Sequence, residues 1–246
     1  MPKPASPETV LISPPAPHKK SRNLKTADRI LDTARRLFNE RGERNVTASD
    51  IALELDISPG NLYYHFKGTD SIHPALFTQL QRELVSLLGA PIQSPELFAE
   101  QDGDSAIERS WLFLTVILEK ILEYRYLYAN PNDLGHRFPD IERGFRRLVK
   151  LKRAACEAIG KELIGSALTG PSDPKLERLV DAMTLTLTYW VSFDQLNHPA
   201  DADAVVVHRG VLQLLSFCAP YLGDEQQAFY AECEQLYRQM LASDDF

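Results

Sequence analysis

A ten-residue run of the chain, SPGNLYYHFK at residues 58–67, combines side chains that suit contact with a nucleic acid. Pro59 fits the first position of a helix, where a missing N–H costs nothing, and Leu62 and Phe66 can both face a core. Glycine lets a backbone approach a base edge, asparagine can pair with adenine, and tyrosine can reach sugars and phosphates. The residues expected to face a DNA groove are Pro59, Gly60, Asn61, Tyr63, Tyr64 and His65.

The residues before this run predict the helices that would position it. Residues 26–41 place apolar residues at helical spacing, and Gly42 can end that helix in the left-handed conformation. Thr47 can cap a short second helix, with Asp50 at the capping-box position, and a tight turn at residues 56–57 follows. Ser58 is placed to cap the third helix. Helix, short helix, turn and short helix is the arrangement of a helix-turn-helix unit. An ordinary half-buried surface helix remains the alternative.

The charge of the chain is distributed unevenly. The net charge is −7, yet residues 1–67 carry 11 Lys and Arg against 8 Asp and Glu, which leaves −10 on the remaining residues. A mildly basic head on an acidic body is compatible with DNA binding, because only the surface that faces DNA must be positive. A basic cluster in the tail, Lys19, Lys20 and Arg22, either reaches a minor groove or belongs to a solvated spacer.

From residue 71 onward the sequence predicts helix after helix and no strand. Glycine- and proline-rich breaks separate the expected helices, which are 71–88, 104–128, 141–164, 175–197, 203–221 and 225–241. The predicted fold class is therefore all-α, with a helix-turn-helix head on a helical bundle. The expected domains are a disordered tail at 1–23, the head at 24–70 and the body at 71–246.

Two body segments, residues 111–128 and 183–194, hold more large apolar residues than one helix face needs. Each aromatic alone fits a packed core, but together with a few polar groups they can also line a ligand cavity. The basic segment at residues 137–153 is either a solvated face or a lip for the anionic end of a ligand. The candidate ligand-binding residues are Trp111, Tyr124, Tyr128, Arg146, Thr186, Trp190 and Asp194.

The last two expected helices carry apolar stripes that suit a dimer interface. Two such helices from each subunit would form a four-helix seam. The stripe residues are Val207, Val211, Leu214, Leu215, Cys218, Phe229, Cys233, Leu236 and Met240.

Other classes of protein find little support in the sequence. No nucleophile elbow, P-loop, dinucleotide-binding glycine motif or HExxH run is present, so we expect no enzyme, no catalytic residue, no metal and no cofactor. No apolar run is long enough to cross a membrane, and the N-terminus lacks a secretory signal. The three scattered cysteines are expected as buried free thiols, in keeping with a cytoplasmic protein. A helical interaction protein whose head no longer binds DNA remains a second alternative.

Residues 26–77 resemble the N-terminal domain of the tetracycline-repressor (TetR/AcrR) family of bacterial regulators. The resemblance implies a homodimer that binds near-palindromic double-stranded DNA and releases it when the body binds a small effector. By position it implies a phosphate contact at Thr47, base reading at residues 59–61 and Tyr63, and backbone contacts at Tyr64, His65 and Lys67, with Ser58 among the DNA-binding candidates.

Two positions depart from the family pattern. Asp56 stands where the turn usually has glycine, and Asp tolerates the left-handed conformation better than most residues. Thr69 stands where a lysine is usual, which weakens one phosphate contact. Residues 124–153 and 184–196 also resemble family members found with polyhydroxyalkanoate synthesis genes. That likeness implies an acyl-chain effector, a fatty acid or an acyl-CoA.

Overall fold

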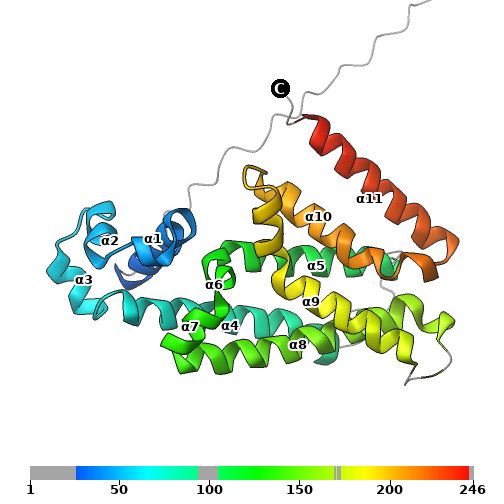
Figure 1. The fold of residues 1–246 in the computed structure, drawn as a ribbon, viewed down its shortest axis with the longest axis horizontal. Helices are drawn as coiled ribbons and strands as arrows, with labels where there is room; N and C mark the ends of the chain where they lie inside the picture. The colour runs from blue at the N-terminus through cyan, green and yellow to red at the C-terminus, as the bar shows by residue number, and fades with distance from the viewer. Residues whose placement is uncertain (1–25, 94–104, 169, 171–172, 244–246) are drawn as a thin grey trace, which may run out of the picture.

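The structure is a computed structural model of the chain, and it describes residues 26–93, 105–168, 170 and 173–243. All regular elements of these residues are helical, so the predicted all-α class is confirmed. Three short helices form a head at one end of a longer helical body (Figure 1). The head consists of α1 (Thr26–Arg41), α2 (Ala48–Glu54) and α3 (Pro59–His65), with a 3₁₀ turn at Glu43–Asn45 between the first two. The predicted tail at 1–23 lies outside the described residues.

Local sequence signals account for the head. The backbone N–H of Asp50 donates to Thr47 Oγ1 at 3.2 Å, and the N–H of Thr47 donates to Asp50 Oδ2 at 2.8 Å, which is the predicted capping box. Ser58 Oγ accepts the N–H of Asn61 at 3.2 Å and caps α3. Asp56 has a positive φ of 53°, as expected for the residue in place of glycine. Leu62 is fully buried and anchors α3 to the head core.

Gly42 ends α1 in a different way from the prediction. Its φ is 79°, but its ψ of 143° lies outside the left-handed helical region, so the chain leaves α1 extended. Glycine reaches this combination of angles far more readily than residues with a side chain. Glycine is thus required at this position, although for another conformation.

The body consists of eight further helices among the described residues. They are α4 (Thr69–Gln93), α5 (Ala106–Glu123), α6 (Arg125–Ala129), α7 (Pro131–Arg137), α8 (Pro139–Ile164), α9 (Pro174–Asn197), α10 (Asp203–Ser216) and α11 (Asp224–Ser243). Short 3₁₀ turns follow α8 and α10. α8 packs against α4 on one side and α9 on the other, while α10 packs against α5, α9 and α11 (Figure 1). One contiguous apolar core runs from the head through the body.

Two glycines let these helices approach closely. A Cβ on Gly144 of α8 would lie 2.1 Å from the ring of Phe77 on α4. A Cβ on Gly210 of α10 would lie 2.5 Å from the indole of Trp190 on α9. Any larger residue would force these helices apart or displace a large aromatic ring.

Four predicted boundaries in the body are wrong. The expected helix at 203–221 ends as α10 at Ser216 and is followed by a 3₁₀ turn at Ala219–Tyr221. α4 continues through the expected break at residues 89–95 as far as Gln93. The expected helix at 104–128 is interrupted at Tyr124, whose φ of −117° and ψ of 33° are not helical. The expected loop at 130–139 contains α7, because Asn130 caps it by accepting the N–H of Asp133 at 3.2 Å and Pro131 occupies the first position.

Candidate nucleic-acid interface and ligand pocket

All nine predicted DNA-contacting residues are exposed at the free end of the head. They lie on α3, at its cap and just after it, and at the cap of α2. Tyr64 is 85% exposed and Tyr63 55%, which is unusual for aromatic side chains in a folded domain. The structure therefore presents these residues on a surface that a DNA groove can reach.

Gly60 is the most informative of these positions. Its φ is negative, and a Cβ built on it would meet only Ser58 Oγ, at 3.9 Å. Neither the backbone conformation nor the packing of the head requires a glycine at this position. A surface outside the chain that must approach the backbone of α3 would require one.

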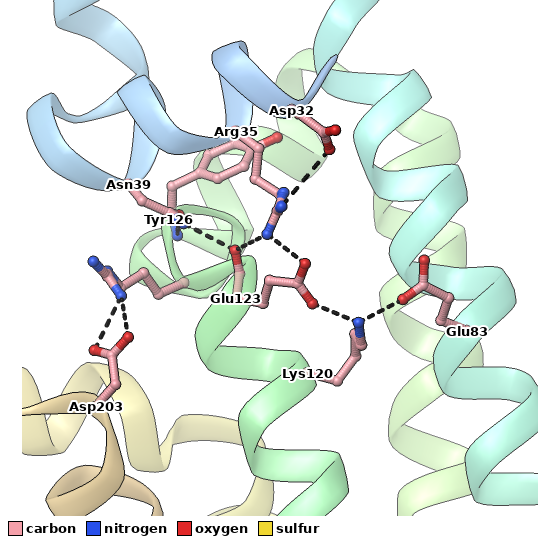
Figure 2. A network of polar contacts seen from close by, with 9 residues as sticks. Asp32, Arg35, Asn39, Glu83, Lys120, Glu123, Tyr126 and Asp203 are labelled. Carbon is pink, nitrogen blue, oxygen red and sulfur yellow. Dashed lines mark hydrogen bonds and ion pairs between the residues drawn. The ribbon is translucent and has the colours of Figure 1, made fainter. Parts of the chain in front are cut away.

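The head is joined to the body by side chains of α1 that meet the interruption between α5 and α6 (Figure 2). Asn39 Nδ2 donates to the backbone oxygen of Glu123 at 2.9 Å, and Asn39 Oδ1 accepts the N–H of Tyr126 at 3.1 Å. An interrupted helix leaves backbone groups without their usual partners, and this one amide pairs with two of them. The head is thus fixed to the point where the body helix breaks.

Ion pairs extend this junction. Arg35 pairs with the Glu123 carboxylate at 2.6 Å and donates to its backbone oxygen at 3.2 Å. Lys120 bridges Glu123 to Glu83 of α4, the latter at 2.8 Å (Figure 2). The resulting chain of charges connects α1, α5 and α4.

A second set of contacts joins the head to α7. Arg44 pairs with Asp133 at 2.5 Å, and Arg137 pairs with Glu43 at 3.5 Å. Both arginines also line a hollow of about 580 Å³ beside α3. Because each arginine is paired with a carboxylate, its positive charge is already balanced within the protein.

Beneath this junction lies an aromatic cluster. The His73 ring of α4 stacks on Phe38 of α1 at 4.5 Å between centroids, and the rings of Tyr126 and Phe138 lie 5.9 and 5.7 Å from it. Burial, followed by the positive charge of Arg137, lowers the pKa of His73 to about 4, while Asp70 opposes the shift. His73 is therefore neutral at physiological pH.

The body contains a cavity of about 580 Å³ between α6, α7, α8 and α9. Its apolar wall includes Tyr128, Phe145 and Val149, and Thr188 and Tyr189 close it from α9. Polar groups surround the opening: Asn132, His136, Glu142, Arg146 and Lys150. The size and the mixture of apolar wall and few polar groups suit a small ligand.

Of the seven predicted ligand-binding residues, the structure brings only Tyr128 and Arg146 together at this cavity. Sequence reasoning missed Phe145 and Thr188, and it included Lys150 only as part of the basic lip. Phe145 and Lys150 lie in the basic segment that is expected at a ligand's anionic end. Their spacing from Arg146 on one helix was a signal that they could line the same site.

The other predicted ligand residues have packing roles. Trp111 contacts His208 and Phe229, and Tyr124 lies under the guanidinium of Arg35. Trp190 donates to the backbone oxygen of Val206 at 2.9 Å.

Asp194 forms a bidentate pair with Arg209, at 2.7 and 2.8 Å. This ion pair and the contacts of Trp111 and Trp190 hold α5, α9, α10 and α11 together. Asp194 thus lies in an internal ion pair and not at the cavity.

Thr186 and Trp190 instead line a second, shallower hollow on the outer face of α9. The exposed apolar residues of that face recur at helical spacing: Leu185, Tyr189, Phe193 and Leu196. Their exposed fractions lie between 47% and 86%, so they form a continuous apolar stripe. We refer to these four residues as the α9 stripe.

Most apolar residues of the stripe predicted for the last two helices are buried within the subunit and not exposed for a dimer interface. Val207, Val211, Leu214, Leu215 and Cys218 of the α10 region are buried within the subunit, as is Cys233 of α11. They pack against the body because α11 folds back over α10 and α5. Leu236 is half exposed, and Phe229 and Met240 are partly buried.

The remaining predictions concern cysteines, metals and membranes. Cys156, Cys218 and Cys233 are free and buried, as expected. Within the described ranges, no group of three or more His, Cys, Asp or Glu residues is placed to hold a metal ion. No helix in the described part of the chain combines the length and apolar character needed to cross a membrane.

Comparison with known families matches the chain in two segments. Residues 93–230, more than half of the chain, match the family described as "Bacterial transcriptional repressor" (TetR). Residues 30–76 match "Bacterial regulatory proteins, tetR family". The crystal structure of a TetR-family transcriptional regulator from Marinobacter aquaeolei VT8 is similar with a TM-score of 0.71 and 26% identity, over 87% of this chain and 99% of that one.

Two curated relatives are similar over a short part of the chain. The HTH-type transcriptional regulator UidR of Escherichia coli K12 is 34% identical over 68 residues, 28% of this chain and 35% of UidR. The negative transcriptional regulator of the biofilm operon icaADBC, IcaR of Staphylococcus aureus, is 44% identical over 46 residues, 19% of this chain and 25% of IcaR. The chain thus spans about a third and a quarter of the length of these two relatives.

Proposed function

The chain belongs to the TetR family of bacterial transcriptional repressors, and from that premise we propose a ligand-responsive repressor that binds a near-palindromic operator as a homodimer. Family members are DNA-binding regulators and not enzymes. The proposed effector is a small molecule with an apolar chain and an anionic end, of the fatty acid or acyl-CoA type. Action on the chromosome would place the protein in the cytoplasm.

The observation that carries the DNA-binding proposal is the exposed face of α3 with its unneeded glycine at position 60. In this arrangement α3 enters a major groove, where Asn61 and Tyr63 contact base edges. The side chains at its flanks, Tyr64, His65 and Lys67, contact the backbone and fix the register.

The proposed effector site is the cavity between α6 and α9, and α6 connects it to the head. This five-residue helix carries Tyr128 in the cavity wall and Tyr126 in the cluster beneath α1. The backbone N–H of Tyr126 in this helix donates to Asn39 Oδ1 of α1. A ligand that displaces Tyr128 would therefore alter the seat of the head, and it releases DNA only if it binds that altered arrangement more tightly.

The proposed dimer interface is the α9 stripe with the adjoining surface of α10, covered by the same stripe of a second copy. Two reading heads on one palindrome require a symmetric partner, and a self-complementary apolar face provides one. This assignment replaces the expectation for the last two helices, most of whose apolar residues are already buried.

The test is footprinting and gel-shift titration with the DNA that flanks the gene. We expect protection of a near-palindrome whose half-sites are about one helical turn or slightly more apart, with affinity that falls as salt rises. Asn61→Ala should relax base preference at one position in each half-site, whereas the matched variant Lys67→Ala should weaken all sequences equally and reduce the salt dependence. Uniform, sequence-independent coverage of the DNA would exclude the proposal.

A further inference from the structure

Lys152 of α8 is the only lysine or arginine in the described part of the chain whose side chain is fully buried, with 1% exposed. Its Nζ donates to the backbone oxygen of Leu187 on α9 at 3.2 Å and lies 4.7 Å from the centroid of the Tyr128 ring. None of the ion pairs among the described residues includes it. An ammonium group with three donors is thus buried with one hydrogen bond and no carboxylate.

The position of Lys152 relates it to the proposed effector cavity. Tyr128, whose ring lies against Nζ, also lines that cavity, and so does Thr188, the residue after the carbonyl that Nζ contacts. Phe145 and Val149 of the cavity wall precede Lys152 by seven and three residues and share its side of α8. The ammonium group lies directly behind the wall formed by these side chains.

Tyr128 contributes a second polar group without a partner. Its hydroxyl is buried, and it makes no hydrogen bond among the described residues. Its ring meets Phe145 edge-on at 5.4 Å, so only apolar contacts hold it in the wall. A buried hydroxyl without a partner, and a buried ammonium group with one hydrogen bond against the same ring, are both costly to the unliganded protein.

The basic residues at the cavity opening are weaker candidates for an anion. Arg146 is 75% exposed in its side chain and is already paired with Glu142 at 2.6 Å. Lys150 is exposed to solvent, where an ion pair contributes little. The strongest attraction for a negative charge is therefore behind the wall and not at the opening.

We infer that Lys152 and the Tyr128 hydroxyl together bind a free carboxylate of the effector, so that the effector is the ionised acid and not its thioester. The apolar chain then occupies the cavity along Phe145 and Val149. An acyl-CoA has no carboxylate at the end of its acyl chain, so it leaves the Tyr128 hydroxyl without a partner and the Lys152 ammonium without a counter-charge. This inference rests on the proposed function and narrows its effector class.

The electrostatics of the site agree with this arrangement. Burial lowers the pKa of Lys152 to about 7, and the nearby Cys156 thiol, whose pKa is itself raised to about 12 by burial, offsets little of the shift. The other groups that face the site are the Tyr128 hydroxyl, Thr184 and Thr188, which carry no charge, and His136, Glu142, Arg146 and Lys150 at the opening. A carboxylate at Nζ holds Lys152 protonated, so binding above pH 7 takes up a proton.

The experiment is calorimetric titration of the full-length protein with decanoate, 1-decanol and decanoyl-CoA. We expect wild type to prefer decanoate. Lys152→Met should weaken decanoate about 10- to 100-fold and leave 1-decanol unchanged or tighter. Tyr128→Phe keeps the ring and should weaken decanoate by a smaller factor. Lys161→Met, an exposed lysine on the same helix and outside the cavity lining, is the matched control and should bind decanoate like wild type.

Two further readouts separate an anchor from a structural residue. Titrations at pH 8 in buffers of different ionisation enthalpy should give close to one proton taken up by wild type and none by Lys152→Met. Thermal unfolding should show Lys152→Met at least as stable as wild type, because it removes a buried charge.

Unchanged decanoate affinity in Lys152→Met and Tyr128→Phe overturns the inference. Tighter binding of decanoyl-CoA than of decanoate by wild type also overturns it but leaves the proposed acyl effector intact. Failure of wild type to bind any of the three ligands overturns both the inference and the proposed effector, while operator binding by footprinting tests the repressor independently.

Discussion

At the scale of single residues, the residues that the fold itself does not require are the best guide to what the protein contacts. Gly60 has room for a methyl group, and Lys152 is buried without a counter-charge. Each is explained more simply by a molecule outside the chain, DNA at Gly60 and a ligand at Lys152, than by the needs of the fold. Substitutions at such positions separate function from stability.

Gly60→Ala should leave the stability of the head unchanged or slightly higher, because alanine is the better helix former and its methyl group meets nothing closer than 3.9 Å. Operator affinity should fall by about 1–3 kcal/mol, since the methyl group would hold α3 away from the bases. Thermal unfolding and gel-shift titration of the same preparation check both parts. Equal operator affinity would mean that α3 does not approach the bases at this residue.

His73 gives a pH-dependent stability. Its pKa is about 4 in the folded protein and about 6.5 in the unfolded chain, so between these values only the unfolded chain binds the proton. The free energy of unfolding should therefore decrease as the pH falls from 6.5 to 4, by up to about 3 kcal/mol. Urea unfolding across this range, compared with His73→Phe, isolates the contribution. A variant with the same pH slope as wild type would assign the loss to other groups.

At the scale of elements, the five-residue helix α6 is central because a side chain from another element pairs with the backbone where it begins. The sequence from 104 to 128 predicts one unbroken helix, and the side chain that pairs with the interruption is Asn39, in another element. Sequence periodicity contains no information on such a partner. α7 was missed for a different reason, because its local signals, the Asn130 cap and Pro131, lie in a run whose prolines and glycine also fit a loop.

Asn39→Ala should uncouple the head from the body. It leaves the backbone oxygen of Glu123 and the N–H of Tyr126 without this partner, at a cost of about 1–3 kcal/mol of stability. We expect operator binding to persist and effector-dependent release to weaken, measured by fluorescence anisotropy with labelled operator. Asn45→Ala, which removes a hydrogen bond within the head only, is the control. Full release in Asn39→Ala would exclude this path of coupling.

At the scale of the whole molecule, α9 carries more exposed large apolar residues than any other helix of the described ranges, the four of the α9 stripe. Phe193→Glu places a charge in its middle and should convert a dimer to monomers, with loss of tight operator binding. Leu112→Glu on α5, which is 65% exposed and outside the stripe, should remain dimeric. Sedimentation equilibrium distinguishes them. A dimer that survives Phe193→Glu and dissociates on Leu236→Glu would restore the original expectation for the last helix.

The head and the fold class were predictable from sequence because their signals are local. Each of these features, the cap at Thr47, the turn at Asp56 and the cap at Ser58, depends only on residues within four positions of itself. The binding cavity was predictable only in outline. Trp111 and Asp194 have the right chemistry for a ligand site, but their partners, His208 and Arg209, lie far along the chain. In the sequence, Lys152 is one more charged residue in a basic helix. Its burial depends on the packing of α9 against α8.

Tyr189 belongs to two surfaces at once, the wall of the cavity proposed for the effector and the α9 stripe. A single ring cannot adjust to a ligand without altering the face offered to a second subunit. Assembly and effector affinity are then thermodynamically linked: the apparent dissociation constant of the effector depends on protein concentration, and the effector shifts the monomer–dimer equilibrium by the same factor. The cellular abundance of the protein would in this way set the effector concentration at which its genes are switched on.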